Sequence, residues 1–329
     1  YQGGSKDRLF SCYCADWVKP VSGYVDLFNP EVARKVIEMV YEEYGKRFSR
    51  YFGSIIRGIF IDEPQHYNGF PWSEVFKKEF EKRYGYDALD SLYLLVLDRE
   101  GHIKFRTEYY RLVEELTCES FYQPLSCWCL EHNLVLTGHL CQEERLTQLA
   151  VNHGGTYWHL SQMQIPGIDA LNVGDGLQGG LAGMEAPNYS VKMASSIAHI
   201  NGYSRVLCEA GGGAGWKMGL GEFKRMTDWL LALGVNLLNP HQSLISIKGI
   251  RKRDFPPSHF WQEPWWKYYP EFSRYVAGVS WVLSQGKHWA EIGLLIPSST
   301  LWALSQGRGQ NKKLKELCSQ IEETCKLLI

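Results

Sequence analysis

The 329-residue sequence predicts an α/β fold: a (β/α)8 barrel of the TIM type that lacks its first strands, followed by the start of a second, Rossmann-like α/β domain. Short apolar strands alternate with long amphipathic helices, which is typical of a parallel sheet. Several strands end in acids, histidines or asparagines, and the active site of such a barrel lies at those carboxyl ends. A doubly wound open sheet would instead gather polar residues near one switch point.

Short apolar runs bounded by polar residues or glycine indicate the strands. The run Ile59-Phe60-Ile61, for example, stops at Asp62-Glu63-Pro64, where a buried strand would leave the sheet. The predicted strands are RLFSCYC (8–14), GIFID (58–62), LVLTGHL (134–140), IDALNV (168–173), RVLCEA (205–210), GVNLLNPH (234–241) and EIGLLIPS (291–298).

Helices are expected where apolar residues recur with a helical period between start and stop signals. Asn29 and Pro30 open the segment 29–48 as N-cap and first helical residue. Ser73 and Gly85 bound a second helix, and Gly234 closes the amphipathic segment 221–234. The segment 105–133 is the remaining long helical pattern.

The predicted domain boundary falls near residue 287. Residues 1–287 would form the barrel, and residues 288–329 would form the first βα unit of the second domain. Six predicted strands precede the boundary, two fewer than a closed barrel needs. Because the chain also begins with Tyr1 rather than Met, we expect two βα units and further domains of the same polypeptide to lie outside this sequence.

Composition narrows the class of partner. The 36 acids and 35 bases nearly cancel, which argues against a nucleic-acid or anionic-membrane partner, and the basic run at 248–254 is interpreted as a solvated loop. No apolar run reaches membrane-spanning length. The nine cysteines include no C-x-x-C pair, so we expect no zinc site and a reducing, cytoplasmic location.

Two carboxylates carry the chemical prediction. Glu63 follows the strand 58–62, and Glu209 follows the apolar run Val206-Leu207-Cys208 ahead of the glycine-rich loop GGGAGW. Two acids that face one pocket suit glycoside hydrolysis, with one as the proton donor and the other as base or nucleophile. The alternative is that each acid caps a helix or pairs with an arginine.

Further polar and aromatic residues at the strand ends are candidates for substrate binding. Some have a plain structural alternative, because helix N-termini favour acids and turns favour aspartate. The candidates are Asp62, His139, Glu143, Asp169, Trp216, Asn239 and His241.

Other chemistries lack their motifs. There is no G-x-S-x-G nucleophile elbow. The loop GGGAGW has neither the Lys and Ser or Thr of a phosphate-binding loop nor the last glycine of a dinucleotide fingerprint.

The sequence resembles the α-L-rhamnosidase-like glycoside hydrolases of family 106 and their unclassified relatives. The resemblance rests on VDLFNPEVARKVIEMVYEEYGKRF with IRGIFIDEP, on TGHLCQEE, MQIPGIDAL and KMASSIAHINGYSRVLCEAGGGAGW, and on GVNLLNPHQSLISIKGIRKRDFPPSHFWQEPWW, in this order. It implies a carbohydrate substrate and a barrel in which Glu63 ends the fourth strand as general acid and Glu209 ends the seventh as base or nucleophile. It also implies a calcium dependence that the sequence assigns to no residue. The chain departs from related barrels at Asp62, where Asn usually precedes the acid.

Two rival functions remain open at this stage. The family 42 β-galactosidases are a more distant resemblance and imply a retaining mechanism, whereas the rhamnosidase resemblance implies inversion. The second rival is a non-catalytic sugar-binding or scaffold protein with a degenerate barrel.

Overall fold

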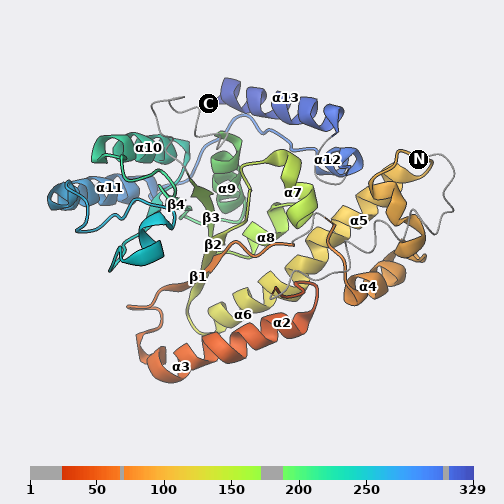
Figure 1. Cartoon of the computed structure of the whole chain (residues 1–329), viewed down its shortest axis with the longest axis horizontal. Helices are drawn as coiled ribbons and strands as arrows, with labels where there is room; N and C mark the ends of the chain where they lie inside the picture. The colour runs from red at the N-terminus through yellow and green to blue at the C-terminus, as the bar shows by residue number, and fades with distance from the viewer. Residues whose placement is uncertain (1–23, 67–69, 172–187, 307–310) are drawn as a thin grey trace.

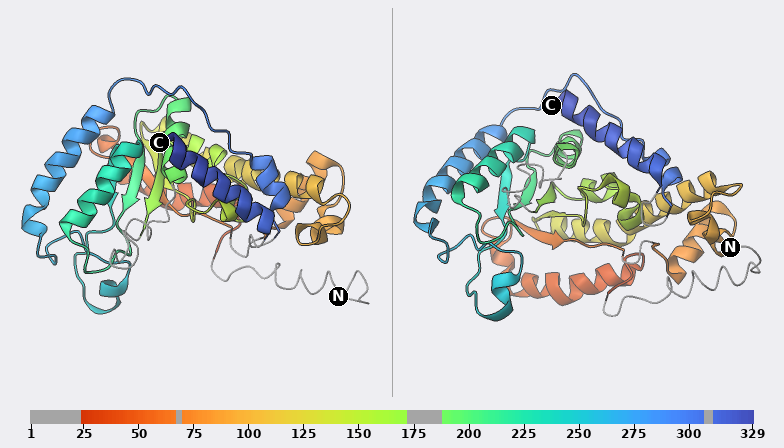
Figure 2. Two further views of the ribbon diagram at one scale, coloured as in Figure 1. Left: turned by 90° about the horizontal axis from the view of Figure 1, so that it is seen from above. Right: turned by 45° about the horizontal axis from the view of Figure 1, so that its top comes forward.

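The computed structural model describes residues 24–66, 70–171, 188–306 and 311–329. Its centre is a five-stranded parallel sheet whose strands lie in chain order, so each strand pairs with the next one along the sequence. The sheet curls, and helices cover its outer face (Figures 1 and 2). The strands are β1 (Gly58–Asp62), β2 (Val135–His139), β3 (Ile165–Ala170), β4 (Leu207–Ala210) and β5 (Leu237–Pro240).

The predicted α/β class is confirmed, but a complete barrel is not. β1 and β5 are the two edges of the sheet and do not pair with each other, so the described strands form about half of a barrel. Closing a barrel of this type requires eight strands with a fixed stagger, and five cannot complete the circle. The predicted strand 8–14 lies outside the described residues.

The strand predicted at 291–298 is wrong. Residues 291–297 form no regular element, and the chain then enters the helix α12 (Ser298–Leu304). Ile292 and Leu295 are largely exposed. An apolar run becomes a strand only where a sheet edge accepts its backbone hydrogen bonds, and no described strand pairs with this segment.

Helices connect successive strands, and further helices come after β5 in the sequence. Two long helices contain one π-type turn each, η1 and η4. The helices before β3 are α2 (Pro30–Val36), η1 (Ile37–Tyr41), α3 (Glu42–Phe48), η2 (Ser49–Tyr51), α4 (Glu74–Tyr84), η3 (Ala88–Leu95), α5 (His102–Thr117), η4 (Cys118–Tyr122), α6 (Gln123–Glu131), α7 (Leu146–His153) and α8 (Tyr157–Ser161). Those after it are α9 (Asn188–Ile200), α10 (Leu220–Leu233), η6 (Gly249–Arg253), η7 (Trp266–Tyr268), α11 (Tyr269–Leu283), α12 (Ser298–Leu304) and α13 (Lys312–Leu328).

The predicted helix ends are confirmed where the sequence carried a signal. The Asn29 side chain accepts a hydrogen bond from the Glu31 N–H at the start of α2, and the Ser73 hydroxyl accepts one from the Phe76 N–H at the start of α4. Gly85 and Gly234 end α4 and α10 in the left-handed conformation that glycine adopts without strain.

The C-terminal helices pack directly on helices that surround the sheet. Trp302 of α12 lies in the same buried cluster as residues of α5, and its indole N–H donates to the carbonyl of Gly154. α13 packs its buried side chains, among them Leu314 and Ile321, against Leu146 of α7 and Tyr189 of α9. Whether a separate domain starts near residue 288 therefore stays a prediction.

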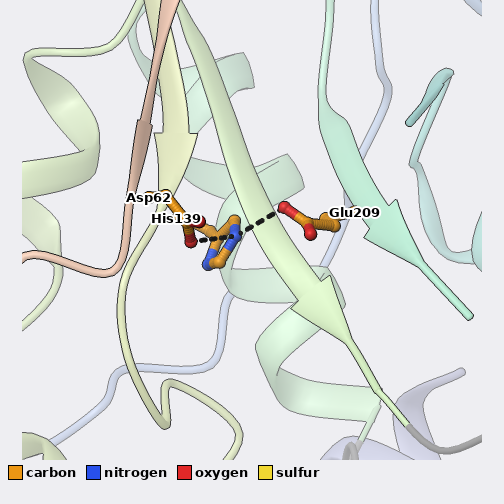
Figure 3. A group of neighbouring side chains, drawn as sticks. All are labelled: Asp62, His139 and Glu209. Atoms are coloured by element: carbon orange, nitrogen blue, oxygen red, sulfur yellow. Dashed lines mark hydrogen bonds and ion pairs between the residues drawn. The ribbon is translucent and has the colours of Figure 1, made fainter. Parts of the chain in front are cut away.

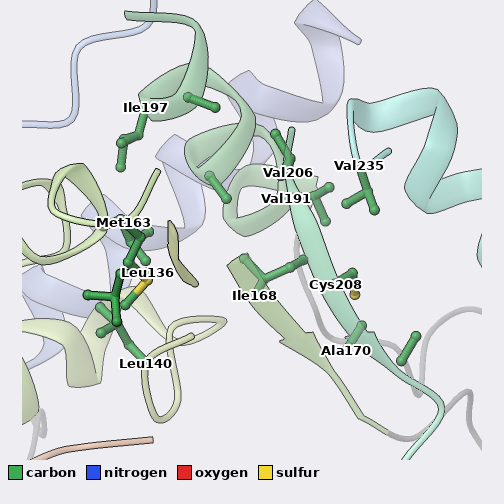
Figure 4. Close-up of a cluster of buried hydrophobic side chains, with 14 of the residues drawn as sticks. Leu136, Leu140, Met163, Ile168, Ala170, Val191, Ile197, Val206, Cys208 and Val235 are labelled. Carbon is green, nitrogen blue, oxygen red and sulfur yellow. The ribbon is translucent and has the colours of Figure 1, made fainter. Parts of the chain in front are cut away.

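Alternation along the strands separates the core from the site. Ile168 and Ala170 on β3, and Cys208 and Ala210 on β4, are fully or almost fully buried against the outer helices (Figure 4). Successive side chains of a strand point to opposite faces, so the residues between them point to the concave face of the sheet. Every second residue near the carboxyl end of these strands is therefore free to form a site.

Close strand packing requires a glycine at position 138. Gly138 has φ +141°, and a Cβ at this position would clash with the backbone carbonyl of Ile61 on β1. The contact brings β1 and β2 together just before Asp62 and His139, which are register partners.

Within the described residues, the helices are all too short or too polar to cross a membrane.

Candidate active site

Polar side chains gather at the carboxyl ends of the strands, on the concave face. Asp62 on β1 pairs in register with His139 on β2. Asp169 on β3 pairs with Glu209 on β4, which pairs with Asn239 on β5. Register partners in a parallel sheet point to the same face, so these residues line the concave face at the carboxyl end of the half-barrel.

His139 lies between two carboxylates (Figure 3). Its Nε2 atom is 3.0 Å from Glu209 Oε2, in a hydrogen bond, and 3.5 Å from Asp62 Oδ1. The His139 side chain is almost wholly buried, whereas the Asp62 side chain is 71% exposed and the Glu209 side chain 12% exposed. The cluster is therefore closed at Glu209 and open toward solvent at Asp62.

The acids keep His139 positively charged. Burial alone would lower the pKa of His139, but the hydrogen bond to Glu209 and the charges of Glu143 and Asp169 outweigh burial and raise it to about 10. An imidazolium inside a ring of acids stabilises the ionised form of whichever carboxylate it contacts.

Glu63 and Glu209 have opposite pKa shifts. Burial raises the pKa of Glu63, although the charge of His139 and a hydrogen bond with Cys141 oppose the shift. Burial would also raise the pKa of Glu209, but the hydrogen bond and charge of His139, with the charge of His241, reverse the shift and lower it. Two carboxyl groups whose environments separate their pKa values are the pattern of an acid and a base in one site.

Glu63 occupies an unusual backbone position. Its φ is +46°, in the left-handed region that non-glycine residues rarely adopt. One carboxylate oxygen of Glu63, one ring nitrogen of His139 and one oxygen of Asp169 all lie within 4.8 Å of one another. The sharp turn after β1 thus directs Glu63 to the same imidazole that Glu209 contacts.

Two more buried acids, Glu143 and Asp169, lie near His139. Glu143 is fully enclosed, and its Oε1 accepts a hydrogen bond of 2.6 Å from the Asp169 N–H; burial raises the pKa of Glu143 to about 8. Burial, opposed by His139, raises the pKa of Asp169 to about 7. Asp169 Oδ1 is buried without a hydrogen-bond partner among the described residues, which leaves one acceptor available to a ligand.

His241 completes the cluster on the side of β5. Its backbone N–H donates to the Ala210 carbonyl, and its Nε2 is 3.8 Å from Glu209 Oε1. A Cβ on Gly212 would lie 3.0 Å from the His241 ring, so the glycine-rich loop lets the imidazole pack on the backbone.

The structure brings most of the predicted residues together. His139 is surrounded by five of them, Asp62, Glu63, Glu143, Asp169 and Glu209, and His241 lies next to Glu209. Asn239 is placed beside Glu209 by register and is exposed. Trp216 is partly exposed, and its indole N–H donates to the Lys252 carbonyl at 2.7 Å, so its one described hydrogen bond is to η6 and not to this cluster.

Cys141 is a site neighbour that sequence reasoning missed. Its thiol is hydrogen-bonded to Glu63, and its carbonyl accepts a 2.7 Å hydrogen bond from the buried His153. Burial raises the pKa of this thiol to about 12, so it stays protonated and acts as a donor to the carboxylate. Its position between His139 and Glu143 in the sequence was the available signal.

The described residues do not fit calcium well. Calcium prefers six to eight oxygen ligands. The two groups of side chains close enough to share an ion, Asp62 with Glu209 and Glu63 with Asp169, each include His139 as the third member. A nitrogen that its neighbours keep protonated is a poor ligand for this cation, so neither group suits calcium.

One comparison with known proteins assigns the family, and a second shows the fold. The family model described as alpha-L-rhamnosidase, glycoside hydrolase family 106, matches residues 20–307. The solved structure of a rhamnosidase from Novosphingobium sp. PP1Y is similar over 80% of this chain with a TM-score of 0.63 and 22% sequence identity, which shows a shared fold. This chain spans 25% of that protein's length. The search of curated proteins found no match.

The match to the family model covers most of the sequence, and the fold likeness is independent of it. The family resemblance seen in the quoted segments is confirmed by the family model. The chain belongs to the α-L-rhamnosidase family, glycoside hydrolase family 106.

Proposed function

We propose that this chain carries the catalytic centre of an inverting glycosidase that releases a terminal α-L-rhamnosyl group. The observation that carries the proposal is that Glu63 and Glu209 both lie close to the His139 imidazolium and have opposite pKa shifts. The family supports the reaction class, and the division of roles between the two acids is our inference.

Glu63 is the general acid in this proposal. Burial favours its neutral form, so it holds a proton that it donates to the glycosidic oxygen as the bond to the anomeric carbon breaks. The Cys141 thiol, which hydrogen-bonds the carboxyl group, fixes its orientation. The exposed side of the cluster at Asp62 leaves room for the departing group.

Glu209 is the general base. Its lowered pKa keeps it ionised at neutral pH, so it accepts a proton from the water that attacks the anomeric carbon. His139 keeps its own proton and stabilises the charge of Glu209, and it is a positioning residue rather than a proton donor to substrate. Asp62, Asp169, Asn239 and His241 lie around this point, where they are placed to bind sugar hydroxyl groups.

Sugar binding without hydrolysis is the second candidate function. The buried Asp169 Oδ1 favours it, because this atom has no hydrogen-bond partner among the described residues and could accept from a sugar hydroxyl. The galactosidase-like alternative would make Glu209 a nucleophile, and a retaining enzyme holds its two carboxyl groups closer together than an inverting one.

A panel of nitrophenyl glycosides tests the proposal. The parent should release nitrophenol from the α-L-rhamnoside and not from the β-galactoside. Glu209→Gln should lower kcat/KM by about 10²–10⁴-fold, the usual contribution of a general base. Glu271→Gln on α11, which alters an exposed surface pair with Arg274, is the matched control and should leave the rate unchanged. No hydrolysis by the parent, with saturable binding of L-rhamnose, would favour the binding protein.

A further inference from the structure

We propose that Phe255 is the aromatic platform on which the sugar beside Glu209 rests, an assignment that rests on the proposed glycosidase function. Phe255 follows η6 and is not among the residues that the strand-end pattern indicates. Its ring centroid is 6.2 Å from that of His241, with the two planes at 70°. His241 in turn approaches Glu209 to 3.8 Å, so this one imidazole contacts both the Phe255 ring and the carboxylate that we assign as base.

Phe255 combines exposure with a strained backbone. The residue is 53% exposed, and its φ is +44°. A bulky residue is strained in this region, and such outliers cluster at ligand sites. Glycine would adopt this conformation without strain. A phenylalanine that is both strained and half exposed gains little from folding, so its ring has another use.

The loops after β4 and β5 hold residues 254–256 in place. The N–H of Gly213, in the loop after β4, donates to the Phe255 carbonyl at 3.2 Å, and the Gly215 N–H donates to the Pro256 carbonyl at 2.9 Å. In the loop after β5, the Gln242 side chain donates to the Asp254 carbonyl at 3.3 Å. The backbone that carries the ring is thus tied to the loops after β4 and β5.

The chemistry around the ring selects the ligand. A pyranose presents hydroxyl groups at its edge and a patch of C–H groups on its face. Glu209 and His241 offer hydrogen-bonding atoms, and the neighbouring Phe255 ring offers an apolar face. Ligand sites commonly join aromatic walls to a few convergent polar groups. The geometry therefore suits a sugar ring stacked on Phe255 with its hydroxyls toward the carboxylate.

Three substitutions separate ligand binding from folding. In Phe255→Gly and Phe255→Ala, we expect KM for the nitrophenyl α-L-rhamnoside and Kd for L-rhamnose to rise about tenfold, which corresponds to a loss of about 1.4 kcal/mol of stacking. The kcat value should change little, since platform contacts serve substrate and transition state alike. Phe255→Tyr, which keeps the ring, should bind like the parent.

Thermal stability gives the decisive readout. Phe255→Gly removes the strain, so its Tm should equal or exceed that of the parent while sugar binding weakens. Tyr44→Ala is the control, since Tyr44 on α3 is also 53% exposed but lies on a regular helix, and it should leave Kd and KM unchanged. An unchanged Kd and KM in Phe255→Gly, or a Tyr variant as weak as the Gly variant, would overturn the platform.

The outcome is distinguishable from failure of the proposed function. If the parent hydrolyses the rhamnoside and the Gly variant matches it, only the platform is refuted. If the parent binds L-rhamnose without hydrolysing it, hydrolysis is refuted and the Kd values of the variants still decide the role of Phe255. If the parent neither binds nor hydrolyses rhamnose, both are refuted.

Discussion

Replacing His139 tests how the site keeps its base ionised. Its Nε2 atom donates to Glu209 Oε2 at 3.0 Å, and Glu209 is otherwise in an environment whose burial raises its pKa. His139→Gln retains a neutral donor near the same position and removes the charge, whereas His139→Ala removes both. In each variant the pKa of Glu209 should therefore rise.

The size of the shift follows from the strength of the contact. A hydrogen bond to a charged group contributes about 1.5–3 kcal/mol. One pKa unit corresponds to about 1.36 kcal/mol, so loss of the contact should raise the pKa of Glu209 by about one to two units. His139→Gln should show the smaller shift, because the donor remains, and His139→Ala the larger.

The pH dependence of kcat/KM reports the pKa values of the free enzyme. The acidic limb, where Glu209 gains its proton, should move to higher pH in both variants, while the basic limb set by Glu63 moves in the same direction because the His139 charge also lowers the pKa of Glu63. Carbon NMR of the Glu209 carboxyl group gives the same pKa without turnover. An acidic limb and a carboxyl titration that stay in place in both variants would refute the role of His139.

Three further predictions follow from other parts of the structure. Glu63→Gln should lower kcat/KM by about 10²–10⁴-fold and abolish the basic limb of its pH profile; a retained basic limb would contradict its role as general acid. Burial lowers the pKa of His153 to about 4, so below the ordinary pKa of 6.5 the unfolded parent takes up a proton that the folded parent does not, and the parent loses stability. The unfolding free energy of His153→Gln should therefore rise relative to that of the parent as the pH falls from 7 to 5. A difference between the two proteins that is constant with pH would contradict this prediction. Gly138→Ala should lower the unfolding free energy by more than about 3 kcal/mol, because the new Cβ meets the Ile61 carbonyl. The control Gly221→Ala, inside α10 with open space around it, should raise the unfolding free energy by about 0.5–1 kcal/mol in the same denaturant titration. Equal effects of the two substitutions would refute the steric argument.

Local signals made much of the fold predictable. The strands β1, β2, β4 and β5 lie within the predicted segments, while β3 begins three residues before the predicted one. The caps at Asn29, Ser73, Gly85 and Gly234 were readable because each depends on a side chain or a glycine at a single position. Whether the barrel closes could not be predicted from the sequence, because closure depends on strands at both edges of the sheet and not on any local pattern. The error at 291–298 has the same origin, since a strand needs a partner edge.

The site was predictable to the extent that it follows strand ends and alternation. His139 and Glu209 were found because each lies at the carboxyl end of an apolar strand, and the register then brings them together with Asp62 and Asp169. The position of His139 between the carboxylates of Asp62 and Glu209 could not be predicted from the sequence, because it depends on the curl of the sheet across three strands. The hydrogen bond between Cys141 and Glu63 joins residues far apart in the sequence, and no motif marks it.

The stereochemistry of the product tests the central claim most directly. Proton NMR during the first turnovers of an α-L-rhamnoside identifies the anomer that the enzyme releases before it equilibrates in water. A base at Glu209 that activates water on the face opposite the leaving group predicts β-L-rhamnose as the first product. First formation of the α-anomer would contradict the assignment and make Glu209 a nucleophile.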